Sequence, residues 1–113
     1  MGLDFNNSNA HWSCYGFNRF RARLANEIGI DLDNMAGFGG SELPWNQVKD
    51  DIKPLLNHSD CDGYLSVAEM KLVYPRLIEL VSKWSDNYDK EHALILAKDM
   101  EICVKKNVPL EFQ

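Results

Sequence analysis

The feature that most constrains the fold is the spacing of the apolar residues, which recur every three or four positions along four segments. Such spacing places the apolar side chains on one face of an α-helix, whereas a convincing strand-like alternation with period two is not visible. We therefore expect an all-α fold, a compact domain of about four helices. The expected helices cover about residues 13–28, 44–56, 67–84 and 90–107.

Capping residues indicate where the first and last helices begin and end. Ser13 is a suitable N-cap for the first helix and Gly29 a suitable stop, while Asp89 or Asn87 can cap the last helix. The stretch 29–41 is rich in glycine and short polar residues, yet it carries apolar residues at intervals. This composition predicts a loop that packs down on the core.

Prolines should shape the two middle helices. Pro44 suits the first turn of the second helix, and Pro54 should bend or end that helix because its ring removes a backbone donor. Pro75 interrupts the backbone of the third helix but not its apolar stripe, which predicts a kink in one continuous helix.

The stretch HSDCDGYLSVAE, residues 58–69, separates the second and third helical segments. It contains Asp-x-Asp-Gly, and Glu69 follows Gly63 by six residues. Calcium prefers six to eight oxygen ligands, and alternate side chains of a loop can point at one ion only if the chain turns sharply. The spacing is therefore typical of a calcium-binding loop.

This stretch resembles the loop of an EF-hand, and the resemblance covers about residues 44–84 of a single domain that spans residues 1–113. It implies that Leu65, at the eighth position, pins the loop to a neighbouring segment. It also implies a set of metal ligands, aligned on Gly63: His58 first, Asp60 third, Asp62 fifth, Tyr64 seventh through its carbonyl, Ser66 ninth through its hydroxyl or a water, and Glu69 twelfth.

The first position departs from the family pattern, because His58 stands where an EF-hand has Asp. An imidazole nitrogen is a poor partner for a hard cation, although Asn57 could supply an amide oxygen instead. We expect Ca²⁺ to bind weakly, with Mg²⁺ or no metal as alternatives. The competing interpretation is a plain helix-loop-helix turn in which Asp60 or Asp62 bonds to backbone donors and Glu69 is a surface residue.

EF-hands usually occur in pairs, and no second loop of comparable quality is present in the sequence. A single loop needs bracing by its own domain, by a homodimer partner or by a degenerate second turn. These three alternatives stay open at the level of sequence.

Charge and composition narrow the classes of partner. The net charge of −5 and a pI near 5.1 argue against nucleic acid, and no apolar run approaches the length of a membrane span. Cys14, Cys61 and Cys103 are far apart and follow no signal peptide, so we expect a cytoplasmic protein with reduced thiols. With nucleic acid and membrane disfavoured, we expect the partner to be another protein.

No catalytic site is indicated. Cys14 lies near His11 in the sequence and could also meet His92, but catalytic pairs assemble in space, so adjacency argues for nothing. Arg19 and Arg23 share a helical face, which we interpret as solvated surface. We expect the aromatic residues around Cys14 to form a hydrophobic lid over the core.

These observations predict a small, cytoplasmic, non-enzymatic calcium-binding module that acts through protein–protein contact. The alternative is a metal-independent acidic interaction or inhibitor protein. In size and acidity the chain resembles small proteins of phages and mobile elements, some of which block a host enzyme or defence system. An enzyme with a calcium-supported fold is a third class that the sequence leaves open.

Overall fold

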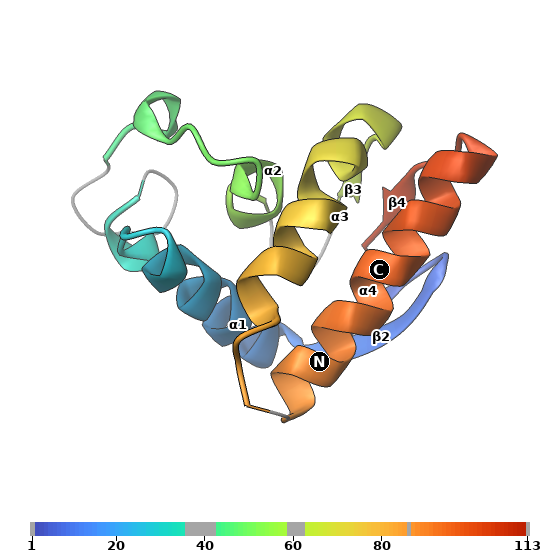
Figure 1. Ribbon diagram of the computed structural model, residues 1–113, viewed down its shortest axis with the longest axis horizontal. Coiled ribbons are helices and arrows are strands. Elements are labelled where there is room, and N and C mark those ends of the chain that lie inside the picture. Colours follow the sequence, from blue (N-terminus) through green and yellow to red (C-terminus); the bar gives the residue numbers. More distant parts are fainter. Residues whose placement is uncertain (1, 36–42, 59–62, 86, 113) are drawn as a thin grey trace.

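A computed structural model describes residues 2–35, 43–58, 63–85 and 87–112. Four α-helices and four short strands occur in these segments (Figure 1). Their order is β1 (Gly2–Phe5), β2 (Ser8–Ser13), α1 (Cys14–Glu27), α2 (Lys53–Leu56), β3 (Tyr64–Leu65), α3 (Val67–Val81), α4 (Tyr88–Lys106) and β4 (Leu110–Glu111), with single 3₁₀ turns at Leu32–Asn34 and Trp45–Gln47.

The expected all-α class is wrong, because the fold is mixed α/β. β1 pairs with β2 in one antiparallel sheet, and β3 pairs with β4 in another. Leu3 and Phe5 of the first hairpin are buried, and so are Ala10 and Trp12, while polar residues alternate with them. This is the period-two pattern of a half-buried strand, but it extends over too few residues to dominate the sequence.

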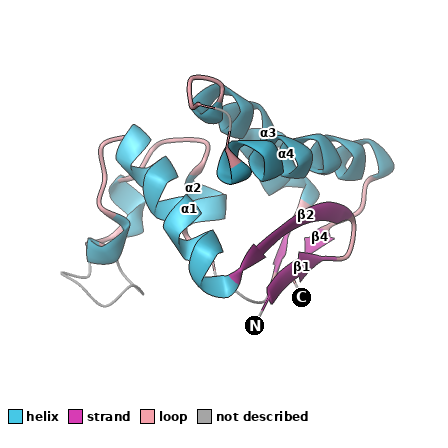
Figure 2. Ribbon diagram, turned by 90° about the horizontal axis from the view of Figure 1, so that it is seen from below, coloured by secondary structure: helices cyan, strands magenta, loops and turns pink. Residues whose placement is uncertain are grey.

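The C-terminal strand connects the two sheets. Leu110 of β4 is paired with Leu65 of β3, and an isolated bridge joins Phe112 to Phe5 at the end of β1. Figure 2 shows β1, β2 and β4 together, below the α3–α4 pair in that view. Segments near the two ends of the chain therefore meet each other, and β4 lies beside β3.

The predicted bounds of the first and last helices are confirmed. The Ser13 side chain accepts a hydrogen bond from the backbone N–H of Gly16, and Gly29 follows the helix with a φ of +80°. Asn87, and not Asp89, is the N-cap of α4, since its side chain accepts from the backbone N–H of Lys90.

The predicted second helix is wrong in extent. Trp45–Gln47 forms only a 3₁₀ turn, and α2 begins at Lys53. Pro54 lies in the first turn of α2, where its missing N–H costs nothing, so it begins a helix instead of ending one. α3 continues through Pro75, as expected for one continuous helix, but ends at Val81, before Trp84.

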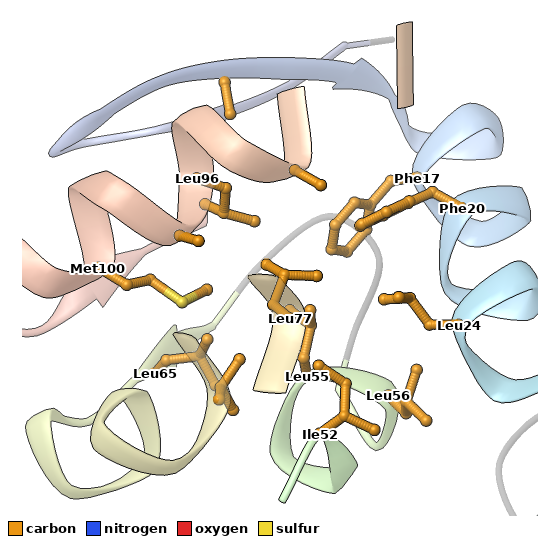
Figure 3. Packing of buried hydrophobic residues seen from close by; sticks show 14 of the residues in the cluster. Phe17, Phe20, Leu24, Ile52, Leu55, Leu56, Leu65, Leu77, Leu96 and Met100 are labelled. Carbon is orange, nitrogen blue, oxygen red and sulfur yellow. The ribbon is translucent and has the colours of Figure 1, made fainter. Parts of the chain in front are cut away.

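One core joins all the elements. Figure 3 shows Leu77 of α3 between aromatic residues of α1, Phe17 and Phe20, and residues of α4, Leu96 and Met100. The residues brought in by α2 and β3 complete this core: Ile52, Leu55, Leu56 and Leu65. Of the helices in the described segments, none has both the length and the apolar composition needed to cross a membrane.

The thiols are not all reduced, contrary to expectation. Cys14 is disulfide-bonded, whereas Cys103 is a free, buried cysteine on α4. Burial raises the pKa of the Cys103 thiol, with a smaller contribution from the charge of Asp99.

Candidate functional site

The structure places part of the predicted metal loop. Asp60 and Asp62, the predicted third and fifth ligands, lie outside the described residues. Asn57, the alternative first ligand, is the C-cap of α2, and its backbone N–H donates to the carbonyl of Lys53. The remaining candidates are His58, Tyr64, Ser66 and Glu69.

Gly63 has the conformation that a turn glycine must have. Its φ is +91°, in the region that other residues rarely adopt. A Cβ atom at this position would stand 3.1 Å from Cε1 of His58, so a side chain would also push against the imidazole. The predicted sharp turn is therefore present, and the ring of His58 lies directly against it.

His58 contacts the residue that was predicted as the seventh ligand. Its Nε2 lies 3.1 Å from the carbonyl oxygen of Tyr64, and its ring stacks on Phe112 with centroids 4.1 Å apart. Because a carbonyl oxygen only accepts, Nε2 carries the proton in this contact. The first and seventh positions of the loop are thus joined directly, through a hydrogen bond.

Ser66 and Glu69 are hydrogen-bonded to each other at the start of α3. The Ser66 hydroxyl accepts from the backbone N–H of Glu69 at 3.2 Å, and the Glu69 carboxylate accepts from the backbone N–H of Ser66 at 2.9 Å. This reciprocal arrangement is a capping box, which satisfies two backbone donors. The ninth and twelfth positions of the loop therefore stabilise the helix end.

The chain supplies its own brace for the loop. Leu65, predicted to pin the loop, is fully buried and pairs with Leu110 of β4. The backbone N–H of Phe112 also donates to the carbonyl of Gly63 at 2.8 Å. Of the three sources of bracing expected, the structure has the first, a segment of the same domain.

Arg21 anchors the entry to the loop, a role that the sequence analysis missed. Its side chain is only 1% exposed and donates to the backbone carbonyls of Leu56 and His58. Its guanidinium also lies 5.0 Å above the ring of Phe17. A signal was available, because position 21 is four residues after Phe17 and three before Leu24, on the apolar face of α1.

A second feature is a hollow of about 540 Å³ where the beginnings of α1 and α4 meet. We call it the arginine hollow. It was also missed from the sequence, because the residues that form it come from distant segments. It is lined by His11, Trp12, Ser13, Gly16, Arg19, Arg23, Asn87, Tyr88 and Asp89.

An ion pair holds one wall of the arginine hollow. Arg23 donates to Asp89 at 2.7 Å, and its guanidinium carbon lies 4.0 Å from the centre of the Trp84 ring. The other carboxylate oxygen of Asp89 accepts from Trp12 Nε1 at 3.1 Å. Glu27 accepts from Trp84 Nε1, and the hydrogen bonds from Lys83 and Trp84 lower the pKa of Glu27.

His11 and Tyr88 also line the hollow, and both contact His92, which is not part of the lining. The backbone N–H of His11 donates to Nδ1 of His92 at 3.0 Å, so the proton of a neutral His92 lies on Nε2. The hydroxyl of Tyr88 donates to the carbonyl of His11 at 2.5 Å, and its ring stacks on His92. Hydrogen bonds and ring contacts therefore fix this part of the lining.

The structure does not assemble the other combinations that the sequence suggested. Cys14 is disulfide-bonded, which removes its thiol from the imagined pair with His11 or His92. In the described segments, which omit Asp60 and Asp62, no three His, Cys, Asp or Glu side chains converge to hold a metal. Comparison with protein-family models, with curated proteins and with solved structures finds no match.

Proposed function

We propose that this chain is a metal-independent, non-enzymatic protein-interaction module in which the EF-hand-like loop is a structural element. The observation that carries this proposal is the hydrogen bond between His58 Nε2 and the Tyr64 carbonyl. In an EF-hand, the cation gathers the first and seventh positions of the loop. Here the imidazole joins them, and Phe112 supports the ring from the other side.

The predicted ligands that the structure describes already have partners in the protein. The Tyr64 carbonyl contacts His58, and the Ser66 hydroxyl and Glu69 carboxylate accept backbone N–H groups. A cation bound through the same oxygen atoms would compete with these hydrogen bonds, each with a net value of about 1 kcal/mol. It would gain at the first position a nitrogen ligand that suits it poorly.

A contact surface for a protein partner is available on α3. Leu72, Pro75 and Ile78 are exposed and three residues apart, which places them along one side of the helix. Leu72 is 49% exposed and Ile78 is 42% exposed. We call these three residues the α3 strip. Since the chain carries a net charge of −5, we propose a basic protein with an apolar patch as the partner.

A second candidate function is the calcium-binding module. It is favoured by the positive φ of Gly63 and by the pairing of Leu65 with Leu110, which match the turn and the pin of an EF-hand loop. Ca²⁺, or Mg²⁺, would then be held by Asp60, Asp62 and Glu69. A cytoplasmic setting is not part of either proposal, because disulfides such as that of Cys14 persist mainly in oxidising compartments.

Capture of a partner by tagged protein tests the proposal and separates the two candidates. The capture is run in EDTA and in calcium, with the wild type and with a Leu72→Asp/Ile78→Asp variant. The matched control is Leu94→Asp/Ile102→Asp on α4, where both side chains are 39% exposed. Light scattering of the purified protein reports whether the captured partner is a second copy of the chain.

We expect a basic protein that is retained equally in EDTA and in calcium, lost with the α3-strip variant and kept with the α4 control. Capture that requires calcium would support the calcium-binding module instead. Capture that is insensitive to the α3-strip variant, or no capture at all, would contradict the proposed surface.

A further inference from the structure

We propose that the arginine hollow binds a small organic anion, in which a phosphate or carboxylate group is attached to a planar body. The hollow has a volume of about 540 Å³, within the range of small-molecule sites. It lies apart from the α3 strip and from the His58 loop. The inference therefore does not depend on the proposed function.

The charge of the hollow favours an anion. Among the described residues that line it, Arg19 and Arg23 are basic and Asp89 is acidic, although the whole chain is acidic. Both oxygens of Asp89 already accept hydrogen bonds, from Trp12 Nε1 and from Arg23. The excess positive charge of this described lining is thus provided by guanidinium groups, which bind oxyanions through paired N–H donors.

The two arginines are four residues apart on α1, so they lie on the same face of the helix. Among the described residues, Arg23 donates one hydrogen bond, to Asp89, and its guanidinium carbon lies 4.0 Å from the centre of the Trp84 ring. An arginine has five N–H donors, so most donors of Arg23 remain for a ligand.

A purely structural role explains the position of Arg23 but not that of Arg19. The Arg23–Asp89 ion pair ties α1 to α4, and that alone accounts for both residues. It does not account for Arg19, which is exposed and has its guanidinium 5.9 Å from the ring of Tyr15. Arg19 is therefore the residue that distinguishes a ligand site from a structural ion pair.

The walls indicate what the anionic group is attached to. Tyr88 lines the hollow and is 51% exposed, whereas Trp12, although also part of the lining, is buried in the core. An exposed aromatic ring packs well against a planar ligand. A free inorganic ion would leave most of the volume and the Tyr88 ring without contact, which favours an aryl phosphate or aryl carboxylate.

The test is a titration of the full chain with phenyl phosphate and with benzoate, followed by tryptophan fluorescence and by calorimetry. Inorganic phosphate measures the contribution of the anionic group alone, and benzamide serves as the uncharged ring. The variants are Arg19→Gln and Arg23→Gln. Lys98→Gln, which removes an exposed positive charge from α4, is the matched control.

We expect saturable binding of phenyl phosphate, benzoate or both, weaker binding of inorganic phosphate, and none of benzamide. Whichever aryl anion binds more tightly identifies the group that the hollow selects. Arg19→Gln should weaken binding about tenfold, the equivalent of one charge-assisted hydrogen bond, while Lys98→Gln leaves the affinity unchanged.

The inference is overturned if neither aryl anion shows saturable binding up to about 10 mM, a limit beyond which affinity is negligible. It is equally overturned if Arg19→Gln and Lys98→Gln have the same effect, since that result reports general charge attraction. Because Arg19 is exposed, the Arg19→Gln variant should fold, and it decides the test even if the Arg23→Gln variant does not fold.

Discussion

Arg76 of α3 holds the carboxylate of Asp50 through two parallel hydrogen bonds, from Nε at 2.9 Å and from the terminal amino group at 2.8 Å. Asp50 also accepts from the backbone N–H of Ile52. The pair fixes the segment that enters α2 against α3. Hydrogen bonding to Arg76 is the main reason why the pKa of Asp50 is lowered, although burial acts in the opposite direction.

Replacing Asp50 with Asn should lower the free energy of unfolding at pH 7 by about 1 kcal/mol, because the Arg76–Asp50 ion pair is bidentate but partly exposed to solvent. A carboxyl whose pKa is lowered on folding stabilises the protein above its unfolded pKa, and this contribution is lost as the pH falls through the folded pKa. The difference between wild type and variant in urea unfolding should therefore shrink below about pH 4.

Asp51→Asn is the matched control for this prediction. Asp51 is exposed, and the structure gives it no ion pair with another described residue. Its replacement should change stability by less than about 0.5 kcal/mol. Equal effects of the two substitutions would mean that net charge, and not the contact with Arg76, determines the loss.

Substitution of Arg21 should lower the free energy of unfolding far more than substitution of Arg19 on the same helix. Arg21→Met keeps the apolar stem but leaves the carbonyls of Leu56 and His58 without this donor, which should cost about 3 kcal/mol. Arg19→Met, at an exposed position, should cost less than about 0.5 kcal/mol. Chemical denaturation of both variants measures the difference, and similar values would contradict the anchoring role.

The pairing of β3 with β4 predicts that replacing the buried leucine of either strand with alanine strongly lowers the free energy of unfolding. Leu65→Ala and Leu110→Ala should each cost about 2–5 kcal/mol, since both side chains are fully buried. Because the residues are register partners, the double variant should show a coupling energy of about 0.5 kcal/mol or more. The control is Leu72→Ala, on the exposed α3 strip. If the losses caused by Leu65→Ala and Leu110→Ala simply add in the double variant, that result would argue against the pairing.

The long helices could be predicted from the sequence because each carries its own signals. α1 and α4 have apolar stripes, and Ser13 and Asn87 cap them locally. The local signals of the strands are weaker, because the alternation in β1 and β2 extends over few residues and β3 and β4 have two residues each. Leu65 becomes a strand residue only because Leu110, far along the chain, lies opposite it, and such a pairing is a property of the tertiary structure.

The candidate site was predictable to a similar degree. The turn at Gly63 and the pin at Leu65 are what the resemblance to an EF-hand loop implies, and Gly63 has a positive φ while Leu65 pairs with Leu110. The contact of His58 with Tyr64 and Phe112 could not be predicted, because it depends on where the C-terminal strand lies. The arginine hollow has the same origin, since Arg23 and Asp89 are far apart in the sequence.

The most direct test of the closed loop is a calorimetric titration of chelator-treated protein with calcium, for the wild type and for His58→Asp. The substitution removes the contact with the Tyr64 carbonyl and restores the carboxylate that EF-hands have at the first position. The wild type should show no saturable heat up to about 1 mM calcium, near the weak limit of such loops, and His58→Asp should gain saturable binding. Saturable binding of calcium by the wild type in this range would contradict the account.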